Sequence, residues 1–240
     1  MERLLTQLVD RLKKAHGDRL KSVILYGSAA SGDHHAKFSD LNVVCMLADV
    51  TPRELAESSA IVRWWREKGN PSPLMLTEEE VRDSSDCFPI EFHDIRERHR
   101  VLYGQDFAAG LEIDKRYYRA QVEHDLRAKL LRLRQRAAGI LEDASLLRNL
   151  LAESVSTFCV LFRHALLLHG VEARFGKREP IAQARERFGI DPEPFLKLLD
   201  LREEKIKPRD IEPVPLLADY MKQIQTVIDS VDRLDTEEPK

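Results

Sequence analysis

Two short runs of small and polar residues could together bind a phosphate group and a metal ion. Gly27 and Ser28 follow the apolar run SVILY. A Gly-Ser turn after a buried strand lets backbone N–H groups and a hydroxyl approach a phosphate closely, and a helix that begins there adds its positive end. Asp40 and Asn42 open the next apolar run, and residues two apart on a strand project from the same face. Two oxygen-bearing side chains beside a phosphate-binding turn are suited to hold Mg²⁺ with a triphosphate.

These residues resemble the signature of a known superfamily. Gly27-Ser28, followed after an interval by Ser39-Asp40-x-Asn42, is similar to the pattern of the nucleotidyltransferase superfamily that includes DNA polymerase β. In that pattern a Gly-Ser pair precedes an Asp-x-Asp or Asp-x-Glu pair that opens the next strand. The likeness in motifs spans about residues 20–104. The helical C-terminal half resembles, in architecture only, the two-domain arrangement of kanamycin nucleotidyltransferase.

The resemblance implies a role for each matching residue. Gly27 and Ser28 would contact the phosphates of a nucleoside triphosphate, with Ser39 beside them, and Asp40 would be the first metal ligand. The third carboxylate of the family comes from a later strand, and Glu91 is the choice here, with Asp94 behind it. Such enzymes transfer a nucleoside monophosphate to an acceptor hydroxyl with two Mg²⁺ ions, or with Mn²⁺. The expected partners are a nucleoside triphosphate and an acceptor that the sequence does not identify.

Asn42 departs from the pattern of the superfamily. It stands where the second carboxylate is usual, and an amide oxygen can ligate Mg²⁺ but contributes no negative charge. A site of Asp40, Asn42 and Glu91 supplies two formal charges where three would face two divalent ions, so metal binding should weaken. The sequence therefore leaves two hypotheses: an active nucleotidyltransferase, or a catalytically weakened nucleotide-binding or regulatory protein of the same fold.

Each residue of the motif also has a purely structural explanation. Gly27-Ser28 could be a simple strand-to-helix turn, and Asp40 could cap a turn or helix. Asn42 could be a satisfied polar residue at a strand end, and Glu91 could face solvent on an edge strand. A toxin–antitoxin-like regulator is a third functional hypothesis.

A basic segment opens the second half of the chain, KRYYRAQVEHDLRAKLLRLRQR. In a kanamycin-nucleotidyltransferase-like arrangement, Arg119, Lys129 and Arg136 would form part of a positive wall facing the triphosphate across a cleft between domains, with Lys129 as a nucleotide-binding residue. Glu123 or Glu153 would then be the carboxylate base.

The alternative for this segment is a solvated helix face. Pairs four residues apart, such as Glu123 with Arg127 and Asp125 with Lys129, stabilise an exposed helix in this way.

The first half of the chain alternates between helical patterns and short apolar runs. Capping boxes begin helices at Thr51 and Thr77, because each threonine is followed three residues later by glutamate. The expected helices are 2–15, 52–68 and a short one after Thr77, and the expected strands start at Ser22, Leu41, Ser72 and Pro89, with a short fifth element at RVLYG. The runs from Ser22 and Leu41 lack alternation, as strands covered on both faces do. This order predicts an α/β (α+β) domain with a mixed sheet.

The second half has helical periodicity almost throughout. We expect helices over about 114–138, 143–169 and 180–188, the last ended by Gly189, followed by one after Pro192 and one over 215–234. Phe158 and Phe162 lie at helical spacing, which favours bundle core over a base-stacking platform. The predicted architecture is a nucleotidyltransferase-fold domain, 1–112, followed by an all-α antiparallel helical bundle, 113–240.

The composition of the chain disfavours several other classes of protein. The chain has 240 residues and a formal net charge of -3, which disfavours a general nucleic-acid binder. No apolar run approaches the roughly 20 residues of a membrane span, and the charged N-terminus lacks a signal-peptide pattern. Three cysteines far apart fit neither a disulfide framework nor a CxxC metal site. We therefore expect a cytoplasmic protein without a membrane partner. A two-lobed protein could form a homodimer, although no residue pattern establishes one.

Overall fold

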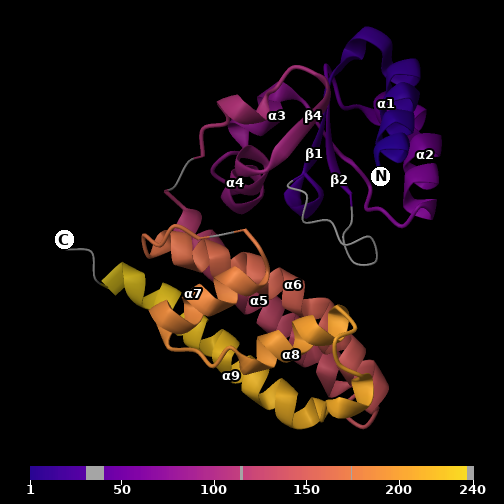
Figure 1. The fold of residues 1–240 in the computed structure, drawn as a ribbon. Coiled ribbons are helices and arrows are strands. Elements are labelled where there is room, and N and C mark those ends of the chain that lie inside the picture. The colour runs from indigo at the N-terminus through magenta and orange to yellow at the C-terminus, as the bar shows by residue number, and fades with distance from the viewer. Residues whose placement is uncertain (31–40, 114–115, 174, 237–240) are drawn as a thin grey trace. The chain divides into compact units, whose positions relative to one another are not determined.

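The computed structural model describes residues 1–30, 41–113, 116–173 and 175–236. The chain divides into two compact units, which we call the N-terminal unit, Met1–Tyr117, and the helical unit, Tyr118–Lys240. Figure 1 shows a sheet flanked by helices in the first unit and a group of helices in the second.

The N-terminal unit contains a four-stranded mixed sheet. Its order is β3-β2-β1-β4, with β1 antiparallel to both β2 and β4, and β2 parallel to β3. The elements are α1 Glu2–His16, β1 Leu20–Tyr26, β2 Asn42–Leu47, α2 Pro52–Glu67, β3 Leu74–Leu76, α3 Glu78–Asp83, α4 Pro89–Glu97 and β4 His99–Gly104. The mixed sheet and its flanking helices confirm the expected fold class of this half.

Helices cover both faces of the sheet (Figure 1). On one face, Val23 and Leu25 of β1 pack in a core with leucines of α1 and with Trp65 of α2. On the other face, Ile24 packs with α3 and α4, through residues that include Phe92. The two central strands are therefore apolar on both sides, which is why their sequences lack alternation.

Both expected capping boxes are present. Thr51 and Glu54 exchange side-chain and backbone hydrogen bonds at the start of α2, and Thr77 and Glu80 do the same at α3. These signals are local, because a cap involves only residues three apart along the chain. Their positions could therefore be read from the sequence.

The prediction of a strand from Pro89 was wrong, because residues 89–97 form the helix α4. Ile90 and Phe92 alternate as in a strand, but a helical spacing also runs through Phe88, Phe92 and Ile95. The rings of Phe88 and Phe92 meet edge to face with centroids 6.5 Å apart, as side chains four residues apart on a helix do. Pro89 at the first helical position and the burial of Phe92 and Ile95 against the sheet favour the helix.

The helical unit is built around one apolar helix, α6, which packs against α5, α7, α8 and α9. The helices are α5 Tyr118–Ala138, α6 Ala144–Leu168, α7 Arg178–Phe188, α8 Glu193–Arg202 and α9 Pro213–Asp232. Phe158 and Phe162 are buried, and their rings contact Tyr220 and Phe195, so both are core residues as expected. Gly189 has the left-handed φ of 69° that ends α7. The helical second half of the expected fold is confirmed.

Among the described helices, α6 alone is long and apolar enough to cross a membrane, judged by length and composition. Its most apolar 18-residue window has a mean hydropathy of 1.4, and 61% of that window is buried inside the protein. The core helix of a bundle has the same properties, and the packing of α6 against four other helices accounts for its composition.

The three cysteines are free thiols in different surroundings. Cys45 on β2 and Cys159 on α6 are buried, whereas Cys87, just before α4, is exposed. Burial raises the pKa of both Cys45 and Cys159 to about 12. The two buried thiols therefore behave as small apolar side chains.

Candidate active site

The turn after β1 needs glycine. Gly27 has a φ of +77°, a conformation that is costly for any residue with a Cβ atom. Its N–H donates to the Arg98 carbonyl at 3.1 Å, and its own carbonyl accepts from the Ala30 N–H at 3.0 Å. The residues Gly27–Ala29 form a short 3₁₀ turn. The turn expected at Gly27-Ser28 is therefore present, and the chain beyond Ala30 lies outside the described residues up to Leu41.

Asn42 meets this turn from the neighbouring strand. It is the first residue of β2 and pairs with Tyr26, the last residue of β1. A Cβ atom placed on Gly27 would lie 3.6 Å from Asn42 Nδ2. The antiparallel pairing thus brings the two motifs together at one end of the central strands. Ser39 and Asp40 lie outside the described residues.

Glu91 and Asp94 lie on α4, and their charges reach the same end of β1. Burial, together with the negative charges of Glu91 and Asp94, raises the pKa of Tyr26 to about 12. Tyr26 immediately precedes Gly27 and has Asn42 opposite it. Both carboxylates therefore lie on the helix α4, and not on the strand that the sequence predicted for them. Glu91 is exposed, whereas Asp94 is half-buried.

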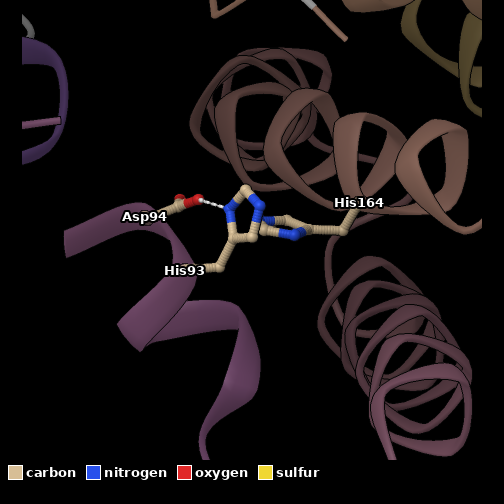
Figure 2. A group of neighbouring side chains, drawn as sticks. All are labelled: His93, Asp94 and His164. Atoms are coloured by element: carbon tan, nitrogen blue, oxygen red, sulfur yellow. Dashed lines mark ion pairs between the residues drawn. The ribbon is translucent and has the colours of Figure 1, made fainter. Parts of the chain in front are cut away.

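His93 stands beside Asp94 on the same helix. Figure 2 shows the Asp94 carboxylate turned toward the His93 ring, with Nδ1 and Oδ1 3.8 Å apart. The third residue drawn there, His164, belongs to α6 of the helical unit. An imidazole next to a carboxylate can stabilise a proton or ligate a metal ion.

His99 is a further titratable side chain near the turn. It begins β4 and pairs with Tyr26 across the sheet. Its Nδ1 lies 3.0 Å from the Arg96 carbonyl, and its Nε2 lies 3.1 Å from Asp106 Oδ2. Although partial burial acts in the opposite direction, hydrogen bonds from His99 and the Ala109 backbone lower the pKa of Asp106. The ring of His99 is thereby fixed in place.

In the helical unit, the two carboxylates considered as a base are ion-paired. Glu123 accepts from Arg119 at 2.7 Å and from Arg127 at 2.6 Å, and Arg136 donates to Glu153 at 3.2 Å. Partial burial raises the pKa of Glu123, but the hydrogen bonds and charges of the two arginines outweigh this effect and hold the pKa below its usual value. A lower pKa makes Glu123 a weaker base.

Lys129 lies exposed on α5. The expected pair of Glu123 with Arg127 is present, and it fits the solvated-face interpretation of this helix. Asp125 instead accepts from Gln121 at 3.3 Å. The charged and polar side chains along the first half of α5 therefore pair with one another on the surface of the helix.

Three cations of the helical unit act on the Cys159 thiol. Burial raises its pKa to about 12, and the positive charges of Lys177, Arg202 and Arg178 act in the opposite direction. Arg163, one turn further along α6, is buried with its guanidinium 4.2 Å from the ring centroid of Phe175. These cations were not identified from the sequence, although the basic pair Lys177-Arg178 at the start of α7 was an available signal.

Comparison with solved structures identifies the fold. The crystal structure of spectinomycin adenyltransferase AAD(9) from Enterococcus faecialis, with ATP and spectinomycin, matches 97% of this chain and 99% of its own, with a TM-score of 0.63 and 11% sequence identity. This chain has a nucleotidyltransferase fold. A likeness at 11% identity extends to the fold and no further.

Other comparisons add no function. A toxin–antitoxin structure with AMP-PNP covers 42% of this chain and 73% of its own at a TM-score of 0.30 and 14% identity, which is too low for any conclusion. No family model matches the sequence, and neither does any curated protein.

Proposed function

We propose that this protein is a nucleotidyltransferase that moves a nucleoside monophosphate from a nucleoside triphosphate to a hydroxyl group of a small molecule or protein. The observation that carries the proposal is the meeting of Gly27 and Asn42 at the end of β1 and β2, in a chain with the fold of an adenyltransferase. The AAD(9) structure contains ATP and a small-molecule substrate, which favours a small-molecule acceptor here.

The residues proposed to bind the nucleotide are Gly27, Ser28, Ser39 and Lys129. The positive φ of Gly27 keeps the turn free of a side chain, so that a phosphate can approach the backbone. Lys129, as an exposed cation, is the proposed partner of the triphosphate in the helical unit.

Asp40, Asn42 and Glu91 are the proposed ligands of Mg²⁺, with Mn²⁺ as the alternative. Carboxylate and amide oxygens are the donors that these ions accept, and the α4 carboxylates act on Tyr26 at the end of β1, so the donor chemistry fits. The bound ion would stabilise negative charge on the transferring phosphate and on the pyrophosphate.

In the proposed reaction, the acceptor oxygen attacks the α-phosphorus of the triphosphate. A new P–O bond forms, the bond between the α-phosphorus and the α–β bridging oxygen breaks, and pyrophosphate leaves. The proton of the acceptor hydroxyl passes to a carboxylate. We assign that role to Asp94, because its carboxylate is half-buried and the His93 ring lies beside it.

The test is release of pyrophosphate and transfer of label from each of the four α-labelled nucleoside triphosphates, with Mg²⁺ or Mn²⁺ and a panel of hydroxyl acceptors that includes aminocyclitols. We expect the Asp40→Asn substitution to lower turnover by at least about a hundredfold. Asp49→Asn is the matched control, because Asp49 is an exposed carboxylate beyond the other end of β2. Absence of turnover with every nucleotide and acceptor would contradict the proposal.

The second candidate function is nucleotide binding without efficient transfer, and Asn42 favours it. Asn42→Asp would restore a third carboxylate and should tighten metal-dependent nucleotide binding by about tenfold, which calorimetry would measure. In this case the variant gains turnover that the wild-type protein lacks. High wild-type turnover that is insensitive to Asn42→Asp would eliminate the candidate.

A further inference from the structure

The loop between α2 and β3 holds the backbone at the start of β2. Asn70 in this loop accepts a hydrogen bond through Oδ1 from the backbone N–H of Leu41, at 3.2 Å. Leu41 lies between Asp40 and Asn42, the two proposed ligands of the motif. A side chain 29 residues away in sequence therefore holds the backbone N–H of Leu41, directly before Asn42.

Asn70 is itself held firmly. Its backbone N–H bonds the carbonyl of Trp65, a fully buried residue of α2, at 3.4 Å. Gly69 donates to the Arg66 carbonyl at 2.9 Å and has a φ of +83°, which turns the chain sharply after the helix. Pro71 restricts the backbone of Asn70 to extended conformations. The amide therefore projects from a rigid support.

Asn70 also takes the place of a strand neighbour that is missing. The pairing of β2 with β3 begins at Val44 opposite Leu74, so the ladder does not reach Leu41. The Asn70 side-chain oxygen supplies the acceptor for the Leu41 N–H, at a position that the β2–β3 ladder does not reach.

From these contacts we infer that Asn70 is a positioning residue, which sets Leu41 and Asn42, at the start of β2, against the Gly27 turn. The inference rests on the proposed function. Because Asn42 Nδ2 lies 3.6 Å from where a Gly27 Cβ would be, a shift of about 1 Å at the start of β2 would change how the two motifs face a common ligand.

The test compares two substitutions of Asn70 in the full chain. Asn70→Ala removes the acceptor and should raise the Mg²⁺ concentration for half-maximal ATP binding by about three- to tenfold, the loss expected for one hydrogen bond. Asn70→Asp keeps an acceptor oxygen and should stay near the wild-type value. Ser72→Ala is the control, because Ser72 is exposed in the same loop. A wild-type Mg²⁺ requirement in Asn70→Ala, or equal impairment of Asn70→Asp, would overturn the inference.

A second measurement does not depend on activity. Hydrogen exchange of the Leu41 amide should accelerate in Asn70→Ala and remain slow in Asn70→Asp and Ser72→Ala. If the wild-type protein binds no nucleotide, the proposed function fails, whereas the exchange of Leu41 still decides whether Asn70 holds this segment. Unchanged exchange in Asn70→Ala would refute the positioning role by itself.

Discussion

At the scale of the residue, Gly27 meets a conformational requirement. Its φ of +77° is costly for a residue with a Cβ atom, whereas a Cβ placed there would meet Asn42 Nδ2 at 3.6 Å, an ordinary contact distance. A substitution here should therefore lower the stability of the turn.

We expect Gly27→Ala to lower the free energy of unfolding by about 1–2 kcal/mol, the usual cost of a left-handed conformation for a residue with a Cβ atom. Gly110→Ala should cost less, because no atom lies within 4 Å of its added Cβ and its φ is outside the left-handed region. Urea unfolding of both variants measures the difference. Equal losses would mean that the Gly27 turn relaxes at no cost.

At the scale of the element, the capping box of α2 gives the stability of the N-terminal unit a defined pH dependence. Hydrogen bonds from the Thr51 hydroxyl and from backbone N–H groups, together with Arg19, lower the pKa of Glu54 from 4.5 to about 2. Because the folded pKa is the lower one, this contribution is complete above pH 4.5 and disappears as the pH falls toward 2.

Acidification from pH 5 to pH 2 should therefore destabilise the wild-type protein more steeply than the Glu54→Gln variant. The measurement is the urea midpoint across this range, with Glu67→Gln, an exposed position on the same helix, as the control. If the urea midpoint of Glu54→Gln fell as steeply with pH as that of the wild type, Glu54 would not be the source of the pH dependence.

Elements were predictable where their signals are local. The boxes at Thr51 and Thr77 each depend on four consecutive residues, and both were read correctly. The segment after Pro89 fits two periodicities, and burial of Phe92 against the sheet selects the helix. No local pattern contains that tertiary contact, so sequence alone could not choose between helix and strand.

In the candidate site, too, the features with a local sequence signal were predictable and those that depend on tertiary contacts were not. The Gly27-Ser28 turn was predictable because glycine and serine at a strand end are a local signal. The pairing of Asn42 with Tyr26, which places it beside the Gly27 turn, and the hydrogen bond between Asn70 and Leu41 join distant segments. Such partners depend on strand register and loop path, which a single sequence does not encode in any short pattern.

At the scale of the whole molecule, each unit has its own core, and the two can be monitored separately. The chain has two tryptophans, Trp64 and Trp65, and both lie on α2 of the N-terminal unit. Tryptophan fluorescence therefore reports on that unit, whereas far-ultraviolet circular dichroism is weighted toward the long helices of the helical unit.

Phe162→Ala should destabilise the helical unit by about 3 kcal/mol, because Phe162 is fully buried against Phe195. We expect the dichroism transition to shift to lower urea while the fluorescence transition stays in place. Val160→Ala, a more exposed position on α6, is the control and should move neither transition appreciably. A parallel shift of both signals would instead show that the units unfold together.

The unequal exposure of the three thiols makes the natural chain suitable for site-specific labelling. A maleimide dye should react at Cys87 and spare Cys45 and Cys159 in the folded protein, since those two are enclosed by packed side chains. Asp86 beside Cys87 raises the pKa of its thiol, so coupling is faster in mildly alkaline buffer. The dye would be attached two residues before α4, where it could accept energy from the tryptophans of α2 and follow the addition of nucleotide without any change to the sequence.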